Sequence, residues 1–188
     1  MASVLESVLA QFTPDVSRMI SRQLGVDQQT VQTAITLAIP ILIAALARNS
    51  SDPQGASSLT NALEQDHDGA ILNDVPGAVR DYQSQPGEGI LKHVLGDQEG
   101  EVSEVLTKTT GVDGATILQM LAPVVMGVLG SMQRQEHLDA TGVATTLGQE
   151  REQIVKSEGP LVETALTQAG RPPDAATAIT DLLQQFLR

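Results

Sequence analysis

The residues best suited to binding chemistry lie between positions 64 and 75, where the spacing is that of an EF-hand calcium loop. Such a loop carries acids at positions one, three and five, a glycine at six and an apolar residue at eight. This spacing lets alternate oxygens converge on a hard cation. Glu64, Asp66 and Asp68 fill the acidic positions here, followed by Gly69 and Ile71. The predicted calcium ligands are Glu64, Asp66, Asp68, Asp74 and the carbonyl of Ala70.

The same segment departs from the calcium-loop pattern at its two ends. Position twelve is Val75 where the pattern has a bidentate glutamate, and Asp74 is the nearest substitute. Position one is Glu64 where an aspartate is usual, which changes the reach of the carboxylate. Any calcium affinity would therefore be weak. The more ordinary interpretation is a capped turn between two helices, with Gly69 at positive φ and solvated acids.

No other residues form a catalytic or cofactor-binding pattern. The three histidines, His67, His93 and His137, are far apart in the sequence and not at metal-binding spacings. The sequence has no cysteine, which excludes disulfides, zinc–thiolate sites and thiol nucleophiles. We therefore predict a non-enzymatic protein whose only cofactor would be calcium.

Residues 20–35 have the spacing of a helix-turn-helix, which raises the alternative of a nucleic-acid binder. Three glutamines after the turn could reach base edges, but few cations are close enough to contact phosphates. The glutamines are Gln28, Gln29 and Gln32, and the cations are Arg18 and Arg22. A net charge of −12 repels a phosphate backbone, so nucleic acid is an unfavourable partner. The turn glycine, Gly25, has a simpler explanation as a corner between packed helices.

The sequence also allows a prediction of where in the cell the protein is located. The segment before Glu6 has no basic residue, so it lacks the pattern of a signal peptide. The longest uncharged apolar window, residues 33–47, has 15 residues, whereas a membrane span needs roughly 20. We expect no membrane span and a cytoplasmic location.

Hydrophobic periodicity predicts helices almost everywhere, and one helical pattern occurs twice. Gly25-Val26-Asp27 leads into the apolar run 37–46, and Gly111-Val112-Asp113 leads into the apolar run 120–129. This internal similarity predicts an all-α fold of two related units. Each apolar run contains a proline, Pro40 or Pro123, where we expect a kink or a restart. Small residues follow both prolines, which predicts close packing of the two helices; they are Ala44, Ala47, Gly127 and Gly130.

Local signals set the expected boundaries of these units. We predict a first unit over 1–74, a Pro- and Gly-rich linker over 75–89, a second unit over 90–150 and a helical tail over 151–188. Helix starts are predicted at Thr13-Pro14, Asp27, Asp52-Pro53, Asp139 or Thr141, Gly159-Pro160 and Pro172-Pro173.

The tail carries an apolar stripe at helical spacing, formed by Ile179, Leu182, Leu183, Phe186 and Leu187. Such a stripe most often covers its own domain's core, although it could instead bind another subunit. Together with the absence of a catalytic set, it leads us to predict an interaction or assembly module. The expected partner is another protein or a second copy, giving a homo-oligomer.

Several motifs in order resemble the YidB-like bacterial family, catalogued as domain of unknown function 937. They are Ala44-Ala45-Leu46-Ala47-Arg48-Asn49, the segments 66–74 and 89–96, and the stretch Ala122 to Gly130. The resemblance covers most of residues 2–150 and implies a bacterial source and a helical, homeodomain-like fold. It implies no activity, and the residues after Arg151 resemble the family less.

Overall fold

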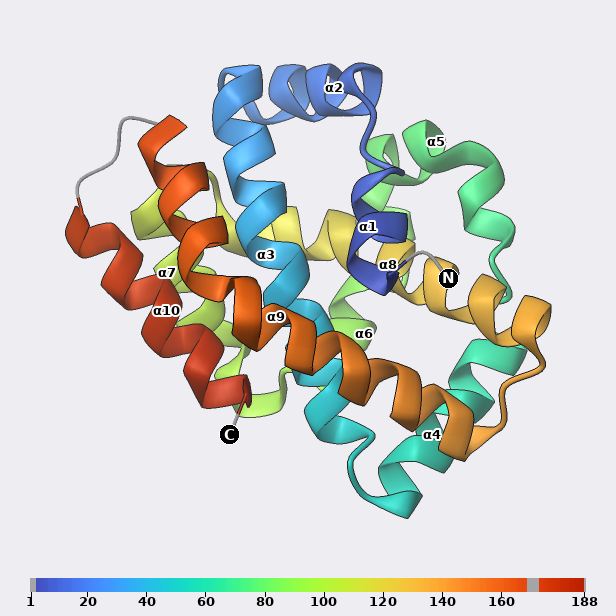
Figure 1. The fold of residues 1–188 in the computed structure, drawn as a ribbon. Helices are drawn as coiled ribbons and strands as arrows, with labels where there is room; N and C mark the ends of the chain where they lie inside the picture. The colour runs from blue at the N-terminus through green and yellow to red at the C-terminus, as the bar shows by residue number, and fades with distance from the viewer. Residues whose placement is uncertain (1–2, 169–172, 188) are drawn as a thin grey trace.

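The computed structural model describes residues 3–168 and 173–187, and these residues form an all-α fold without strands (Figure 1). Side chains are described for residues 3–157 and 177–186. The α-helices are α1 (Val4–Leu9), α2 (Pro14–Leu24), α3 (Gln28–Asn49), α4 (Pro53–Gln65), α5 (Val75–Arg80), α6 (Gly87–Val94), α7 (Glu99–Thr110), α8 (Gly114–Glu136), α9 (Ala140–Gln168) and α10 (Pro173–Leu187). Short 3-10 helices are η1 (Ala70–Asp74), η2 (Tyr82–Ser84) and η3 (Gly96–Gln98).

The predicted helix starts are confirmed at four positions where a side chain caps the helix. Each cap oxygen accepts a hydrogen bond from a backbone N–H in the first helical turn, where these donors lack an intrahelical partner. The caps are Thr13 at α2, Asp27 at α3, Asp52 at α4 and Asp139 at α9, with N···O distances of 3.4, 2.8, 2.9 and 2.8 Å.

The prolines do not restart the helices that contain them, so the expected restart is wrong, while the alternative, a kink, stays a prediction. α3 continues through Pro40 and α8 through Pro123. α9 likewise runs unbroken through residues 159–160, where we expected a new helix. An internal proline removes one hydrogen bond and costs about 3 kcal/mol, while each fully buried aliphatic side chain contributes about 1.5–3 kcal/mol. Burial along α3 and α8 therefore outweighs the defect.

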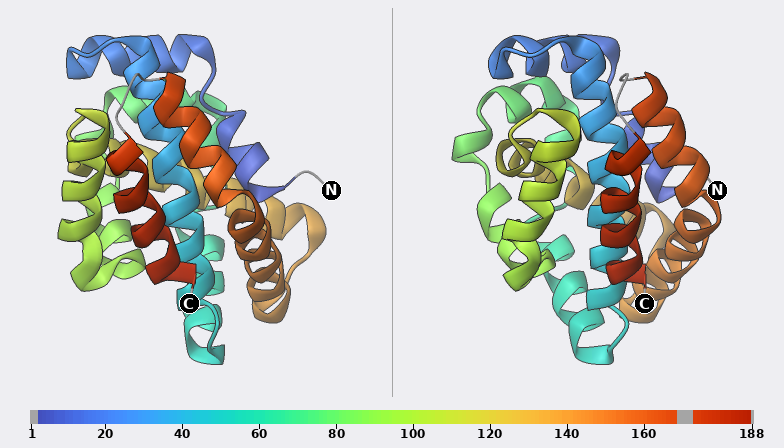
Figure 2. Two further views of the ribbon diagram at one scale, coloured as in Figure 1. Left: turned by 60° about the vertical axis from the view of Figure 1, so that its left-hand side comes forward. Right: turned by 90° about the vertical axis from the view of Figure 1, so that its left-hand side faces the viewer.

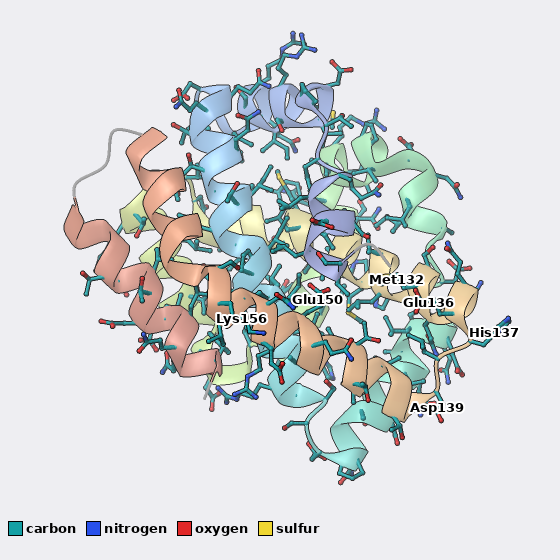
Figure 3. The ribbon with its side chains drawn as sticks, in the orientation of Figure 1. Met132, Glu136, His137, Asp139, Glu150 and Lys156 are labelled. Carbon is teal, nitrogen blue, oxygen red and sulfur yellow. The ribbon has the colours of Figure 1, made fainter. Side chains whose placement is uncertain are left out.

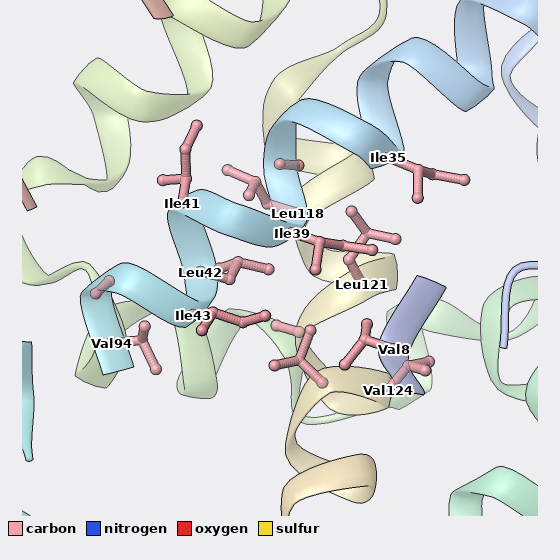
Figure 4. Close-up of a cluster of buried hydrophobic side chains, with 14 of the residues drawn as sticks. Val8, Ile35, Ile39, Ile41, Leu42, Ile43, Val94, Leu118, Leu121 and Val124 are labelled. Atoms are coloured by element: carbon pink, nitrogen blue, oxygen red, sulfur yellow. The ribbon is translucent and has the colours of Figure 1, made fainter. Parts of the chain in front are cut away.

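α3 is the centre of the fold, and its sequence explains why. From residue 37 to residue 47 every side chain of α3 is buried, so the helix is apolar on all sides and needs cover on all sides. α8 crosses it on one side, while α9 and α10 pack on the other (Figures 1 and 2). Figure 4 shows Ile39 of α3 beside Leu121 of α8, with Val8 of α1 close to Val124. The core is mainly aliphatic, with Phe12 and Phe186 as its aromatic members among the described residues.

Two segments expected to lie outside the helical units contribute to this core. Residues 75–89 contain α5 and η2, and Val75 and Val79 are buried. α5 contacts both α2 and α8. α9 passes residue 150 without a break and contacts α3, α4 and α10. The division into units with a separate linker and tail stays a prediction, and the packing is continuous across its boundaries.

The corners at residues 25–30 and 111–116 share one hydrogen-bond pattern. Each corner opens on a glycine in the left-handed region, with φ of 68° and 80°. The aspartate two positions later caps the next helix and also accepts a hydrogen bond from a threonine hydroxyl in its first turn. The residues are Gly25, Asp27 and Thr30, and Gly111, Asp113 and Thr116, with Oγ1···Oδ2 distances of 2.6 and 3.1 Å.

The small residues after Pro123 do not serve the contact between α3 and α8, although these helices do pack together. A Cβ added at Gly130 would lie 1.7 Å from the carbonyl oxygen of His67, and one at Gly127 would lie 2.4 Å from Ile71 Cγ2. The glycines therefore admit the backbone of the segment after α4. The predicted packing of the two long helices is confirmed, but Gly127 and Gly130 do not mediate it.

By length and composition alone, α3 and α8 could each cross a membrane. The 15-residue window predicted from the sequence underestimated the length of these helices. Both continue through their prolines, to 22 residues in α3 and 23 in α8. Inside this fold, 83% of the apolar window of α3 and 72% of that of α8 is buried.

Candidate functional site

The acidic turn, residues 64–74, lies against the C-terminal half of α8. α4 ends at Gln65, and η1 then contacts α8. Gly69 has φ of 89°, which confirms the expected left-handed glycine of a turn. The absence of side chains at Gly127 and Gly130 allows this close approach. Figure 3 marks the same end of α8 by Met132, Glu136 and His137.

The carboxylates of the turn have separate partners and do not converge. Asp68 accepts a hydrogen bond from Ala70 N–H at 2.9 Å, and Asp74 accepts one from Gly77 N–H at 2.9 Å as the cap of α5. The backbone N–H of Asp66 donates to the Ala62 carbonyl at the end of α4. The carboxylates of Asp68 and Asp74 therefore stabilise the local backbone.

Two further contacts fasten the turn to α8. Glu64 accepts a hydrogen bond from Gln133 Nε2 at 3.1 Å, and Arg134 lies 3.6 Å from Asp68. Gln133 is only 4% exposed, and its Oε1 has no partner among the described residues. His67 is half-buried here, and desolvation lowers its pKa below 6.5 even though neighbouring Asp66 acts in the opposite direction.

Across the part of the chain that is described, no three histidine, aspartate or glutamate side chains are grouped to hold a metal ion. The ligands predicted from the calcium-loop spacing, Glu64, Asp66, Asp68, Ala70 and Asp74, are thus near one another in sequence without forming a cluster. Residues 70–74 form the 3-10 helix η1, and Asp74 at its end caps α5. This geometry gives the calcium hypothesis no support.

The predicted helix-turn-helix is present as α2, the corner at Gly25 and the start of α3. Val31 and Ala34 point inward as expected, with no exposed surface. Gln28 uses its amide to donate to the Pro14 carbonyl at 3.2 Å. A recognition helix must enter the major groove, but α3 is covered by α8, α9 and α10 beyond its first turns. Residues 37–47 are buried, so only the two ends of α3 are accessible, which disfavours readout of DNA.

The tail stripe predicted as an interaction surface is buried within the chain. The exposed fractions of Ile179, Leu182, Leu183 and Phe186 are 0, 3, 2 and 1%. Leu187 lies outside the residues whose side chains are described. The four anchors occupy positions i, i+3, i+4 and i+7 of α10, so they share one helix face. That face packs in cis because its apolar surface would otherwise meet water, and the stripe is not a free surface.

α10 is seated on a surface formed by α3, α7 and α9, which we call the α10 docking face (Figure 2). Arg48, in the last turn of α3, places its guanidinium carbon 5.6 Å from the centroid of the Phe186 ring. The same guanidinium donates to Gln98 Oε1 at 2.8 Å. The docking face therefore combines an apolar floor with one cation at its edge.

Residues 6–135 match the family model described as a bacterial protein of unknown function, DUF937. The chain belongs to the DUF937 family. This confirms the resemblance seen in the sequence. Neither a curated protein nor a solved structure matches the chain.

The family match covers two of the three helices that form the α10 docking face but not α10 itself. α3 and α7 lie within the DUF937 segment, while α9 and α10 come after it. In this chain, therefore, an apolar face of the DUF937 segment is covered by helices from the C-terminal 53 residues, 136–188.

Glu150 is a buried charge that the sequence reasoning missed. It is 7% exposed on α9, and its carboxylate accepts hydrogen bonds from Val4 N–H at 2.8 Å and Leu5 N–H at 3.3 Å (Figure 3). Ser3 takes the next donor, Glu6 N–H, at 3.0 Å. Glu150 thus completes the N-terminal cap of α1 from a distant helix. No local pattern signals this, because the partners are 146 positions apart.

Proposed function

We propose that this DUF937 protein is a non-enzymatic, self-associating helical module. In this proposal the α10 docking face of one copy binds α10 of a second copy. The contacts are those that the chain makes with its own α10, so association needs no additional surface. Exchange of an identical element between copies is a low-cost route to a dimer.

The docking of α10 is the observation that carries the proposal. An amphipathic helix bound to an apolar surface through i, i+3, i+4 and i+7 anchors is a common mode of protein recognition. α10 has this pattern, and its four described anchors are almost completely buried. The polar side chains Asp181, Gln184 and Gln185 face away and are exposed. α10 thus has the composition of a ligand helix, with one binding face and one solvated face.

The composition of the docking face also favours a helix over a small molecule or a nucleic acid. α3 contributes only aliphatic residues between residues 37 and 47, with one buried proline, and the whole sequence has only three aromatic residues. Aliphatic side chains pack well against another helix but provide no stacking surface for bases. With a net charge of −12, the chain is also repelled by polyanions.

Light scattering of the full-length chain over a range of concentrations tests this function. We expect a monomer–dimer equilibrium in which the dimer fraction increases with concentration. Leu183→Ala/Phe186→Ala would remove the same contacts from the monomer and from the exchanged dimer, so it cannot test the exchange. Deletion of residues 173–188 removes the exchanged helix itself and should leave only monomer at every concentration. The matched control is Gln184→Ala/Gln185→Ala, which changes the solvated face of the same helix and should behave as the wild type.

Two results would contradict the proposal. One is a full-length chain that stays monomeric up to millimolar concentration. The other is a dimer that persists after residues 173–188 are deleted while circular dichroism shows that the shortened chain is folded, because another surface would then hold the copies together.

We also infer that the corners at residues 25–30 and 111–116 derive from one duplicated unit. The support is their shared use of a left-handed glycine, a capping aspartate and a threonine hydroxyl bonded to that aspartate. The prolines follow the capping aspartates at different distances, 13 residues for Pro40 and 10 for Pro123. The similarity is therefore local to the corners. An experimental structure in which the two corners fail to superpose would overturn this inference.

A further inference from the structure

We propose that Arg48 is a specificity-determining residue of the α10 docking face and selects a ligand helix with an aromatic side chain at its fourth anchor. This inference rests on the proposed function and specifies the ligand chemistry. The ligand helix has aliphatic anchors at its first three positions and an aromatic anchor at the fourth, as α10 has in Ile179, Leu182, Leu183 and Phe186.

The geometry around Phe186 supports this selectivity. The ring is 1% exposed, so it is desolvated, and the Arg48 guanidinium lies 5.6 Å from its centroid. A cation within about 6 Å of an aromatic ring is attracted by the negative charge on the ring face, and desolvation strengthens the attraction. An aliphatic anchor has no such charge distribution and gains nothing from the cation. A basic residue at the same anchor would be repelled.

Arg48 is also held in place by Gln98, the last residue of η3. Its guanidinium donates to Gln98 Oε1 at 2.8 Å, which reduces its freedom before any ligand binds. The next residue, Asn49, donates through Nδ2 to the carbonyls of His93 and Val94 at 3.0 and 2.9 Å. These bonds join α3 to the end of α6. The cation is therefore positioned by the DUF937 segment itself, independently of α10.

A double-mutant comparison with peptides tests this role. The receptor is the full-length chain carrying Phe186→Ala, which weakens its own α10, and the probes are fluorescent peptides of residues 173–188. One peptide has the natural phenylalanine at position 186, and the other carries Phe186→Leu. Fluorescence anisotropy gives both dissociation constants, which are then measured again on a receptor that also carries Arg48→Gln.

We expect Arg48 to favour the phenylalanine peptide. The ratio of the two dissociation constants should fall about two- to fivefold when Arg48 is replaced, the range expected for a cation–aromatic contact of about 0.5–1 kcal/mol. The control receptor, Arg22→Gln in the Phe186→Ala chain, removes an exposed charge on α2 and should leave the ratio unchanged. Circular dichroism verifies that each receptor is folded.

The outcomes separate this inference from the function on which it rests. If both peptides bind and their ratio is the same with and without Arg48, the selectivity is overturned while the docking function stands. If neither peptide binds at millimolar concentration, both proposals fail.

Discussion

At the scale of single residues, the buried Glu150 carboxylate has the clearest consequence. Its two oxygens accept hydrogen bonds from the first two backbone N–H groups of α1, which would otherwise bind water. One of these groups belongs to Val4, which is fully buried. A buried donor left without a partner costs about 1–3 kcal/mol. A short helix such as α1, with six residues, cannot form stably alone and depends on this tertiary cap.

We therefore predict that Glu150→Ala lowers the free energy of unfolding by about 1–3 kcal/mol, measured by urea denaturation. Glu150→Gln retains one acceptor oxygen and should lose less. Glu152→Gln is the matched control, because it changes an exposed carboxylate on the same helix. If Glu150→Ala unfolds at the same urea concentration as the control, the cap contributes nothing to stability.

At the scale of elements, glycines decide how closely the acidic turn approaches α8. The carbonyl oxygen of His67 would lie 1.7 Å from a Cβ at Gly130, well inside van der Waals contact. The obstructing atom belongs to the backbone, so a rotamer change cannot relieve the clash. The turn must move away from α8, and the Glu64–Gln133 hydrogen bond would be strained or lost.

A matched pair of glycine substitutions tests this packing. Gly130→Ala should lower the melting temperature, because overpacking typically costs about 1–3 kcal/mol. Gly100→Ala places a methyl group in open space on α7 and should raise stability by about 0.5–1 kcal/mol through its helix propensity. If the close approach exists, calorimetry should show a lower melting temperature for Gly130→Ala and a higher one for Gly100→Ala. A neutral Gly130→Ala would contradict it.

The elements themselves were largely predictable, because their signals are local. The caps at Thr13, Asp27 and Asp52 depend on side chains within three residues of the donor, and all three were predicted from sequence. The continuity of α3 through Pro40 was not, because it depends on burial contributed by distant helices. The calcium-loop spacing stays a prediction without structural support. Spacing gives the order of Glu64, Asp66 and Asp68 but not the backbone path between them.

At the scale of the whole molecule, what escaped prediction is the pairing of distant segments. The apolar stripe of α10 was recognisable from sequence, but its burial against α3, α7 and α9 was only one of two interpretations. Periodicity identifies an apolar face without naming what covers it. The contact between Arg48 and Phe186, separated by 138 positions, lacks any local signal.

The pH dependence of global stability also belongs to this scale, because two effects oppose each other. The net charge is −12 at pH 7 and the isoelectric point is about 4.4, so mild acidification reduces the repulsion that destabilises the compact state. His67 acts in the other direction. Its pKa is lowered below 6.5 in the fold by desolvation, so below pH 6.5 the unfolded chain takes up a proton that the folded chain resists.

The contribution of His67 is therefore fully present above pH 6.5, decreases as pH falls below that value, and stops decreasing below the pKa of the folded state. We predict that His67→Gln abolishes this decrease, since glutamine does not titrate. The measurement is the difference in unfolding free energy between wild type and variant, from urea denaturation at steps between about pH 5 and 7.5. Taking the difference cancels the repulsion among the other charges, which both proteins share. The wild type should lose stability relative to the variant as pH falls.

A difference that is constant over this range would mean that His67 takes up its proton equally well in the folded and unfolded chains. In that case the segment between α4 and η1 would not desolvate the ring.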